Sequence, residues 1–104
     1  MAVVTVATIT LKPDRYEEYV EKVARPAKAI SEKAGAKNVR LLAGLVAGEA
    51  TGSLAFISEA DDYAAAGALM QKTMADPEIR AMMSTGTASP LASFQVTQWV
   101  DVPL

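Results

Sequence analysis

Residues 61–89 read DDYAAAGALMQKTMADPEIRAMMSTGTAS, which is the pattern of a helix that stops and starts again. Asp61 or Asp62 can cap the first segment, because a short side-chain oxygen accepts from free amide groups at a helix start. Asp76 would cap the second segment, with Pro77 at the first helical position, where its missing N–H costs nothing. The stretch therefore predicts a helix broken near Asp76-Pro77, and this broken helix divides the chain into two similar halves.

Four segments outside this stretch have the character of strands. Residues 3–11 are rich in β-branched side chains and contain no breaker, which favours a strand. Residues 37–47, 53–58 and 91–102 are predicted as strands as well. Glycines at both ends of residues 48–52 can supply the positive φ angles of a tight loop, so we expect the second and third strands to form a hairpin.

A long helix is predicted between the first two strands. It starts at Pro13 and stops at Gly35, which can adopt the left-handed conformation that ends many helices. Pro26 removes one backbone N–H and clashes with the carbonyl one turn earlier, so a kink or a break is expected near residues 22–25. Apolar residues at alternating spacings of four and three predict one buried stripe along this helix: Tyr16, Val20, Val23, Ala27, Ile30 and Ala34.

The predicted order is strand, helix, strand, strand, helix, strand. This order is typical of the ferredoxin-like split βαββαβ motif, an α+β fold with a four-stranded antiparallel sheet and two helices on one face. We expect a single domain over residues 1–104. The uncovered face would expose Val4, Val6, Leu42 and Val46 to water, and such a surface needs a partner. We therefore expect a homodimer in which two sheet faces meet.

The composition excludes several classes of function. The chain has no Cys and no His, so it lacks thiolate chemistry, disulfides, and the commonest general base and metal ligand. A net charge of −2, with basic residues spread along the chain, offers no footprint for nucleic acid or an anionic membrane. The apolar run at 41–48 is far shorter than the roughly 20 residues that cross a bilayer. We expect a cytoplasmic protein without metal or cofactor.

A cleft between helices and sheet is the expected place for a small ligand in such a fold. The candidate ligand-binding residues are Tyr16, Arg40, Met70, Met74, Gln95 and Trp99, with Tyr19, Met82 and Met83 as further candidates from the helices. Each also has a structural interpretation, since Tyr16 lies on the apolar stripe and methionines fill gaps in ordinary cores. Arg40 either points inward, where it needs a partner or an anion, or lies at an exposed rim. Tyr19 lies off the centre of the stripe and is expected near the surface.

The last strand presents two different faces. Alternation places Phe94, Val96 and Gln98 on one side, and Gln95, Thr97 and Trp99 on the other. The second side is polar for a sheet that we expect to be covered on both faces. It fits a wet cavity, a dimer seam or plain solvent exposure.

The split motif, the long first helix and the helix interrupted at Ala75-Asp76-Pro77-Glu78 resemble the dimeric α+β barrel superfamily. The resemblance covers nearly the whole chain. The Asp-Pro-Glu break is similar to the NIPSNAP-like and antibiotic-biosynthesis-monooxygenase-like branches, with Ile79 where a large aromatic residue often follows. The superfamily implies homodimers and chemistries that include cofactor-independent oxygenation, lactone isomerisation and haem-dependent reactions, and it includes proteins without known activity. Branches that depend on a His cannot be carried over.

Two classes of function follow. The first is a small-molecule-binding protein or a cofactor-independent, monooxygenase- or isomerase-like enzyme, with an apolar or aromatic ligand in the cleft. An oxygenase of this kind would orient its substrate and stabilise an anion, with Tyr16, Arg40, Gln95 and Trp99 as the groups involved. Proton abstraction would fall to Glu, Asp, Tyr or water. The second class is a non-catalytic assembly domain whose purpose is dimerisation.

Overall fold

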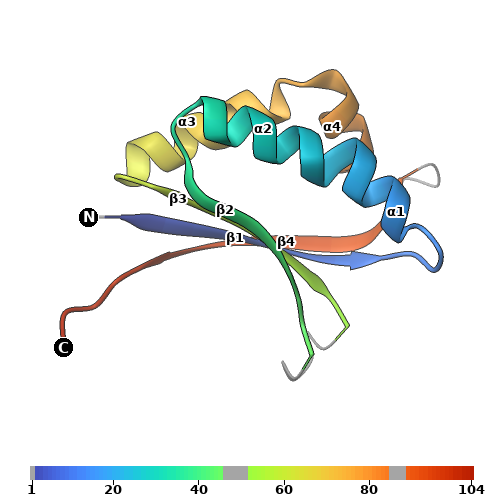
Figure 1. The fold of residues 1–104 in the computed structure, drawn as a ribbon, viewed down its shortest axis with the longest axis horizontal. Coiled ribbons are helices and arrows are strands. Elements are labelled where there is room, and N and C mark those ends of the chain that lie inside the picture. The colour runs from blue at the N-terminus through green and yellow to red at the C-terminus, as the bar shows by residue number, and fades with distance from the viewer. Residues whose placement is uncertain (1, 46–51, 85–88) are drawn as a thin grey trace.

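Four strands and two helical segments follow one another in the predicted order (Figure 1). The computed structural model describes residues 2–45, 52–84 and 89–104. The strands are β1 (Val3–Leu11), β2 (Lys37–Ala43), β3 (Leu54–Ala60) and β4 (Leu91–Val100), and the helical elements are α1 (Tyr16–Tyr19), the π-helical turn η1 (Val20–Ala24), α2 (Arg25–Lys33), α3 (Tyr63–Met74) and α4 (Pro77–Met82). Most of the predicted hairpin loop at 48–52, and Val46, lie outside the described residues.

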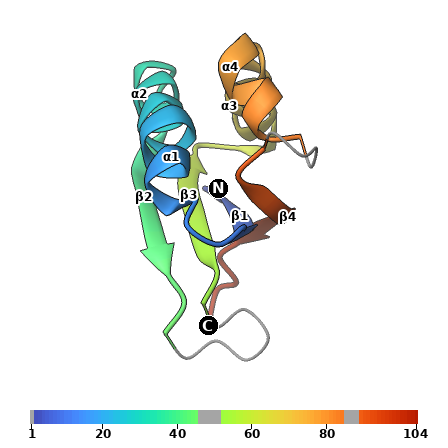
Figure 2. The same cartoon turned by 90° about the vertical axis from the view of Figure 1, so that its right-hand side faces the viewer.

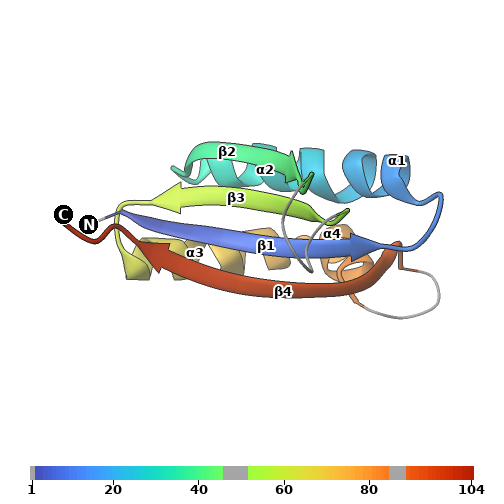
Figure 3. The same ribbon diagram turned by 90° about the horizontal axis from the view of Figure 1, so that it is seen from below.

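The strands form one sheet in the order β2-β3-β1-β4, and every neighbouring pair is antiparallel. This order confirms the ferredoxin-like α+β fold. The helices all lie on one face, with α1 and α2 above the β2 side and α3 and α4 above the β4 side (Figure 2). Figure 3 shows the opposite face, which we call the open face. None of the helices in the described part of the chain is long and apolar enough to cross a membrane.

The strand register decides which side chains face the helices. Ala7 of β1 lies between Phe56 of β3 and Val96 of β4, and these three residues belong to the helix-covered face. Val4, which points the other way, lies opposite Trp99 on the open face. Alternate residues of one strand therefore contribute to two different surfaces.

The helix before β2 contains a π-helical turn immediately before Pro26. The amide of Arg25 bonds to the carbonyl of Val20, five residues back instead of four. Pro26 has no N–H with which to reach the carbonyl of Lys22, so a wider turn relieves this part of the helix. The predicted irregularity is present, but the helix is not broken (Figure 1).

The π turn changes which residues of the first turn face inward. One extra residue in the turn shifts the inward positions before it by one, so Tyr19 takes the place expected for Val20. Tyr19 is 1% exposed, whereas Tyr16 is 55% exposed. The predictions for these two tyrosines are wrong for this reason. Val23 within the turn and Ala27 after it are buried as predicted.

The predicted break in the second helix is confirmed at its capping residues. Asp62 Oδ1 accepts from the amide of Ala65 at 2.8 Å and caps α3. Asp76 Oδ1 accepts from the amides of Glu78 and Ile79 at 3.0 and 3.2 Å and caps α4. The second cap orients α4 so that Ile79, which is 1% exposed, packs in the core.

Candidate ligand-binding cavity

The buried side chains form two separate clusters rather than one. The larger contains Ile9, Tyr19, Val23, Ala24, Ala27, Leu54, Ile79 and Leu91, and the smaller contains Val3, Ala60, Ala66 and Leu69. A cavity of about 270 Å³ takes part of its wall from each cluster. The cavity is open on one side, since Met70, Phe94 and Val96 of its wall are each 39% exposed. An apolar pocket of this size is a candidate binding site.

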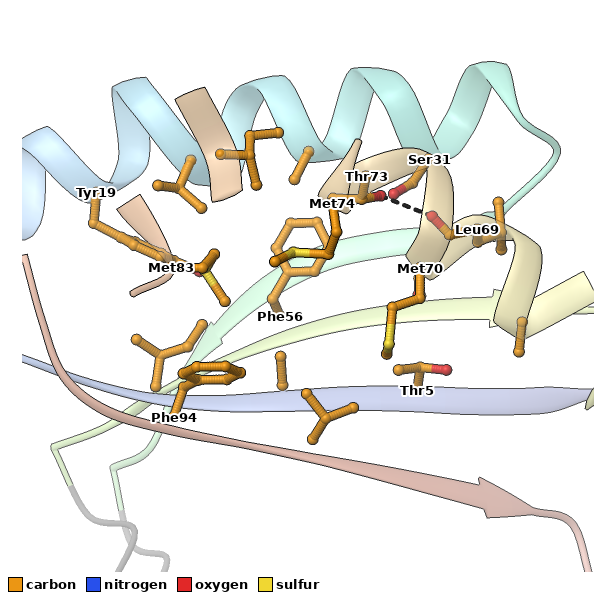
Figure 4. A pocket seen from close by; sticks show the side chains of 18 residues that line it. Thr5, Tyr19, Ser31, Phe56, Leu69, Met70, Thr73, Met74, Met83 and Phe94 are labelled. Atoms are coloured by element: carbon orange, nitrogen blue, oxygen red, sulfur yellow. Dashed lines mark hydrogen bonds between the residues drawn. The ribbon is translucent and has the colours of Figure 1, made fainter. Parts of the chain in front are cut away.

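Small side chains leave this space where the layers face each other. Ala7 of β1, Ala27 of α2 and Ala66 of α3 all line the cavity. Phe56 of β3 and Phe94 of β4 form larger parts of the wall from the sheet side (Figure 4). Because the alanines cannot fill the gap between helices and sheet, their meeting across the two layers leaves the cavity.

Every polar side chain of the described cavity wall carries a hydroxyl group: Thr5, Tyr19, Ser31, Ser58 and Thr73. Thr73 Oγ1 donates to the carbonyl of Leu69 at 3.0 Å (Figure 4). Gln98 Nε2 donates to Thr5 Oγ1 at 3.4 Å. Among the described wall residues there is no carboxylate, ammonium or guanidinium group. The site is therefore apolar with a few hydroxyls and no charge.

Tyr19 is the one titratable side chain among these described wall residues, and it points from α1 toward Met83 of the other helical layer (Figure 4). Its burial raises the pKa of the phenol well above the ordinary value near 10. The hydroxyl therefore stays protonated at neutral pH and can donate a hydrogen bond into the cavity.

Two of the six predicted site residues, Met70 and Met74, line the cavity from α3. The other four lie away from it: Tyr16, Arg40, Gln95 and Trp99. Tyr16 is turned to solvent by the π turn, and strand alternation sends the remaining three to the open face. The residues expected to share one site are thus divided among the cavity, the open face and the solvent-exposed side of α1.

Arg40 is paired on the open face. Its Nη1 lies 3.6 Å from Glu59 Oε2 and donates to the carbonyl of Asn38 at 2.8 Å. The register shifts between Lys37 and Arg40, and Asn38 has a φ of 52° there. The bulge directs Arg40 to the exposed position that was one of its two predicted alternatives.

The helices bring three polar side chains to the wall: Tyr19, Ser31 and Thr73. Ser31 and Thr73 were not predicted, and Tyr19 was a further candidate that was expected near the surface. The signal for Tyr19 and Ser31 was a repeat of four, since Tyr19, Val23, Ala27 and Ser31 follow at this spacing and all line the cavity. Pro26 predicts a kink or a break, whereas a π turn before it brings this series to one face. Thr73 had no comparable signal.

No protein-family model and no curated protein sequence matches this chain. Solved structures do match it. An uncharacterized NIPSNAP-like domain protein from Burkholderia xenovorans has a TM-score of 0.69 at 13% identity, with 97% of this chain and 85% of that one covered. A NIPSNAP family protein from Agrobacterium tumefaciens has a TM-score of 0.70 at 10% identity, with 98% and 94% covered.

The chain has the NIPSNAP-like fold. A "putative antibiotic biosynthesis monooxygenase" from Deinococcus radiodurans shares it as well, with a TM-score of 0.67 at 13% identity over 98% of this chain and 94% of that one. The predicted resemblance is confirmed at the level of the fold. Identities this low carry no activity from these proteins to this chain.

Proposed function

We propose that this NIPSNAP-like chain binds a small apolar molecule in the cavity between its helices and its sheet. The observation that carries the proposal is the 270 Å³ void between two core clusters, walled by apolar groups and a few hydroxyls. Small-molecule sites are commonly of this kind, mainly apolar with a few convergent polar groups. The volume lies just below the usual range of about 300–1,000 Å³, which suits a ligand smaller than a typical drug.

Binding is better supported than proton abstraction within the cavity. A cofactor-independent oxygenase needs a base for its substrate, and such a base works best with a pKa near the operating pH. Among the described wall residues Tyr19 is the one titratable group, and burial raises its pKa. A monooxygenase-like activity, by analogy with one of the structural neighbours, would therefore need a base from outside this wall.

A cavity-filling variant tests the binding proposal. Ala27→Leu would place a larger side chain in the void, whereas Ala29→Leu on the exposed side of the same helix is the matched control. Native mass spectrometry of the protein purified from its own host should show a discrete bound mass for the wild type and for Ala29→Leu, and its loss for Ala27→Leu. Equal occupancy in all three would contradict binding at this cavity.

We further propose that two copies associate through the open face. Trp99 is 62% exposed and Leu42 is 45% exposed on this face, while the helices cover only the other one. Exposed apolar groups gathered on one surface mark interaction sites, and the resemblance to the dimeric α+β barrel superfamily favours a second copy as the partner. This association would serve an assembly role by itself, or would support the ligand site from the other side of the sheet.

Sedimentation equilibrium tests the association. The wild type should be a dimer at micromolar concentration, and Trp99→Glu should be a monomer, because a charge would be placed in the contact. Tyr63→Glu is the control, since Tyr63 is 73% exposed at the start of α3, away from the open face. A monomeric wild type would end the homodimer proposal and leave the cavity proposal untouched.

A further inference from the structure

No described side chain of the cavity wall can neutralise an ion. Among the 18 described side chains that line the cavity, none carries a formal charge at neutral pH. Most of them are aliphatic, aromatic or thioether groups, and the others carry hydroxyls. Burial of an ion without a partner is among the largest unfavourable terms in proteins. The part of a ligand that this wall encloses therefore has to be uncharged.

Two hydroxyls of the wall have no partner among the described residues. No hydrogen bond joins the side chain of Tyr19 or of Ser31 to another described residue, although Tyr19 is 1% and Ser31 is 4% exposed. No fully enclosed side-chain nitrogen or oxygen in the described chain lacks a partner. The two hydroxyls must therefore be reached through the cavity that they line. Both hydroxyls are accessible to water, so a molecule in the cavity, either water or a ligand, is their available partner.

The two hydroxyls lie toward opposite ends of the cavity. Tyr19 is in α1 and Ser31 is in the last part of α2, about 18 Å apart along a helix that rises 1.5 Å per residue. Figure 4 shows Tyr19 at one end, next to Met83, and Ser31 at the other, next to Thr73. Between them the wall is formed by apolar groups such as Met74 and Phe56.

From this arrangement, and resting on the proposed function, we infer that the cavity selects an uncharged, mainly hydrocarbon molecule that carries a carbonyl or similar acceptor at the Tyr19 end. Tyr19 donates its hydroxyl proton to that acceptor, while the methionines and Phe56 enclose the hydrocarbon part. A protonated phenol is a hydrogen-bond donor, and a ketone, quinone or ester oxygen accepts without bringing a charge. Tyr19 thus sets the specificity of the site, and Ser31 offers a second donor to a longer ligand.

The methyl groups of the methionines can report this binding residue by residue in NMR spectra. Met70, Met74 and Met83 line the cavity, whereas Met82 packs against the larger core cluster without lining it. With carbon-13 in the methionine methyl groups, a ligand in the cavity should shift the signals of the first three more than that of Met82. Each probe is titrated into the protein, and its dissociation constant is taken from these signals.

Three probes of similar size distinguish the effect of a ligand charge from that of a carbonyl acceptor. They are α-tetralone, tetralin, and tetralin-1-carboxylate at pH 8. We expect α-tetralone to bind at least about tenfold more tightly than the carboxylate. Tyr19→Phe should weaken α-tetralone about fivefold, which is the loss of one neutral hydrogen bond, and should change tetralin less than about twofold. Tyr16→Phe, in the exposed position of the same helix, should change neither.

The possible results separate the two proposals. Equal binding of the carboxylate at the same methionines would overturn the selection of an uncharged ligand and leave small-molecule binding intact. An equal effect of Tyr19→Phe on α-tetralone and tetralin would overturn the role of Tyr19 as the donor. If none of the three probes shifted Met70, Met74 or Met83 at millimolar concentration, the proposed binding function itself would fail.

Discussion

The two faces of the sheet are built from the same strands but have different surroundings. On the helix-covered face, β1, β3 and β4 contribute to an uncharged cavity with hydroxyl groups in its wall. On the open face the same strands, with β2, present an exposed Trp99 and the Arg40–Glu59 ion pair. Because alternate residues point to opposite faces, neighbours in sequence serve different surfaces. The proposed ligand binding and self-association lie on opposite sides of the sheet, so a substitution on one side should alter one of them and leave the other unchanged.

The largest expected difference between the faces is in stability. Ile9 and Val6 belong to β1, but Ile9 is 1% exposed under the helices and Val6 is partly exposed on the open face. Ile9→Ala should lower the free energy of unfolding by about 2–5 kcal/mol, because it removes buried methyl groups and enlarges a cavity. Val6→Ala should lower it by about 1 kcal/mol or less. Urea unfolding of both variants measures this, and equal losses would contradict the difference in enclosure between Ile9 and Val6.

A pair of substitutions in β4 should separate the two proposed activities. Phe94 lines the cavity and Trp99 lies on the open face. Trp99→Ala should raise the dimer dissociation constant about thirtyfold, since a Trp that becomes buried in an interface is commonly worth about 2 kcal/mol. Phe94→Ala should weaken α-tetralone about tenfold and leave the dimer unchanged. Sedimentation and methionine signals measure the two effects, and a variant that changed both equally would show that the faces are coupled.

The two tyrosines of α1 give a smaller effect that depends on pH. Burial raises the pKa of Tyr19 in the folded state above its value near 10 in the unfolded state. The unfolded chain therefore loses this proton first as the pH rises, and the free energy of unfolding falls above about pH 10, by up to about 1.4 kcal/mol per pH unit. Below about pH 10 the contribution of Tyr19 to the free energy of unfolding does not change with pH.

Tyr19→Phe should remove this part of the pH dependence, whereas Tyr16→Phe should retain it because Tyr16 is exposed. Urea unfolding between pH 8 and about pH 11 gives the comparison, with lysine titration common to all three proteins. Near neutral pH, Tyr19→Phe should be as stable as the wild type or more so, since its hydroxyl has no partner among the described residues. A strong loss of stability at pH 7 would show that the hydroxyl is already satisfied.

Local chemistry made the fold predictable, and side-chain placement was predictable only where the backbone stayed regular. The caps at Asp62 and Asp76 act within three residues, so the broken helix followed from sequence alone. Pro26 predicts an irregular turn, but the sequence around it does not distinguish a kink from a π turn. The π turn places Tyr19 inward and Tyr16 outward, so both side chains were misplaced.

The cavity could not be predicted from the sequence alone, because it depends on how distant elements pack together. Alternation was predicted correctly for β4, with Gln95 and Trp99 on the face opposite Phe94 and Val96, but which face the helices would cover was not stated by any local signal. The space between the layers arises from Ala7, Ala27 and Ala66, which come from three elements far apart in sequence. Each alanine alone suits an ordinary core, and only their meeting leaves a void.

Arg40→Ala should give the smallest effect and still separate two interpretations of the open face. The Arg40–Glu59 pair is partly exposed, with 47% and 24% of the two side chains accessible, and exposed pairs contribute about 0–1 kcal/mol. We expect a loss of less than about 1 kcal/mol in the free energy of unfolding, smaller still at high salt, and no change in α-tetralone affinity. The control is Lys28→Ala, which removes the exposed Lys28–Glu32 pair of α2. If Arg40→Ala abolished ligand binding while Lys28→Ala did not, the ligand would have to reach the open face, and the division of tasks between the two faces would be wrong.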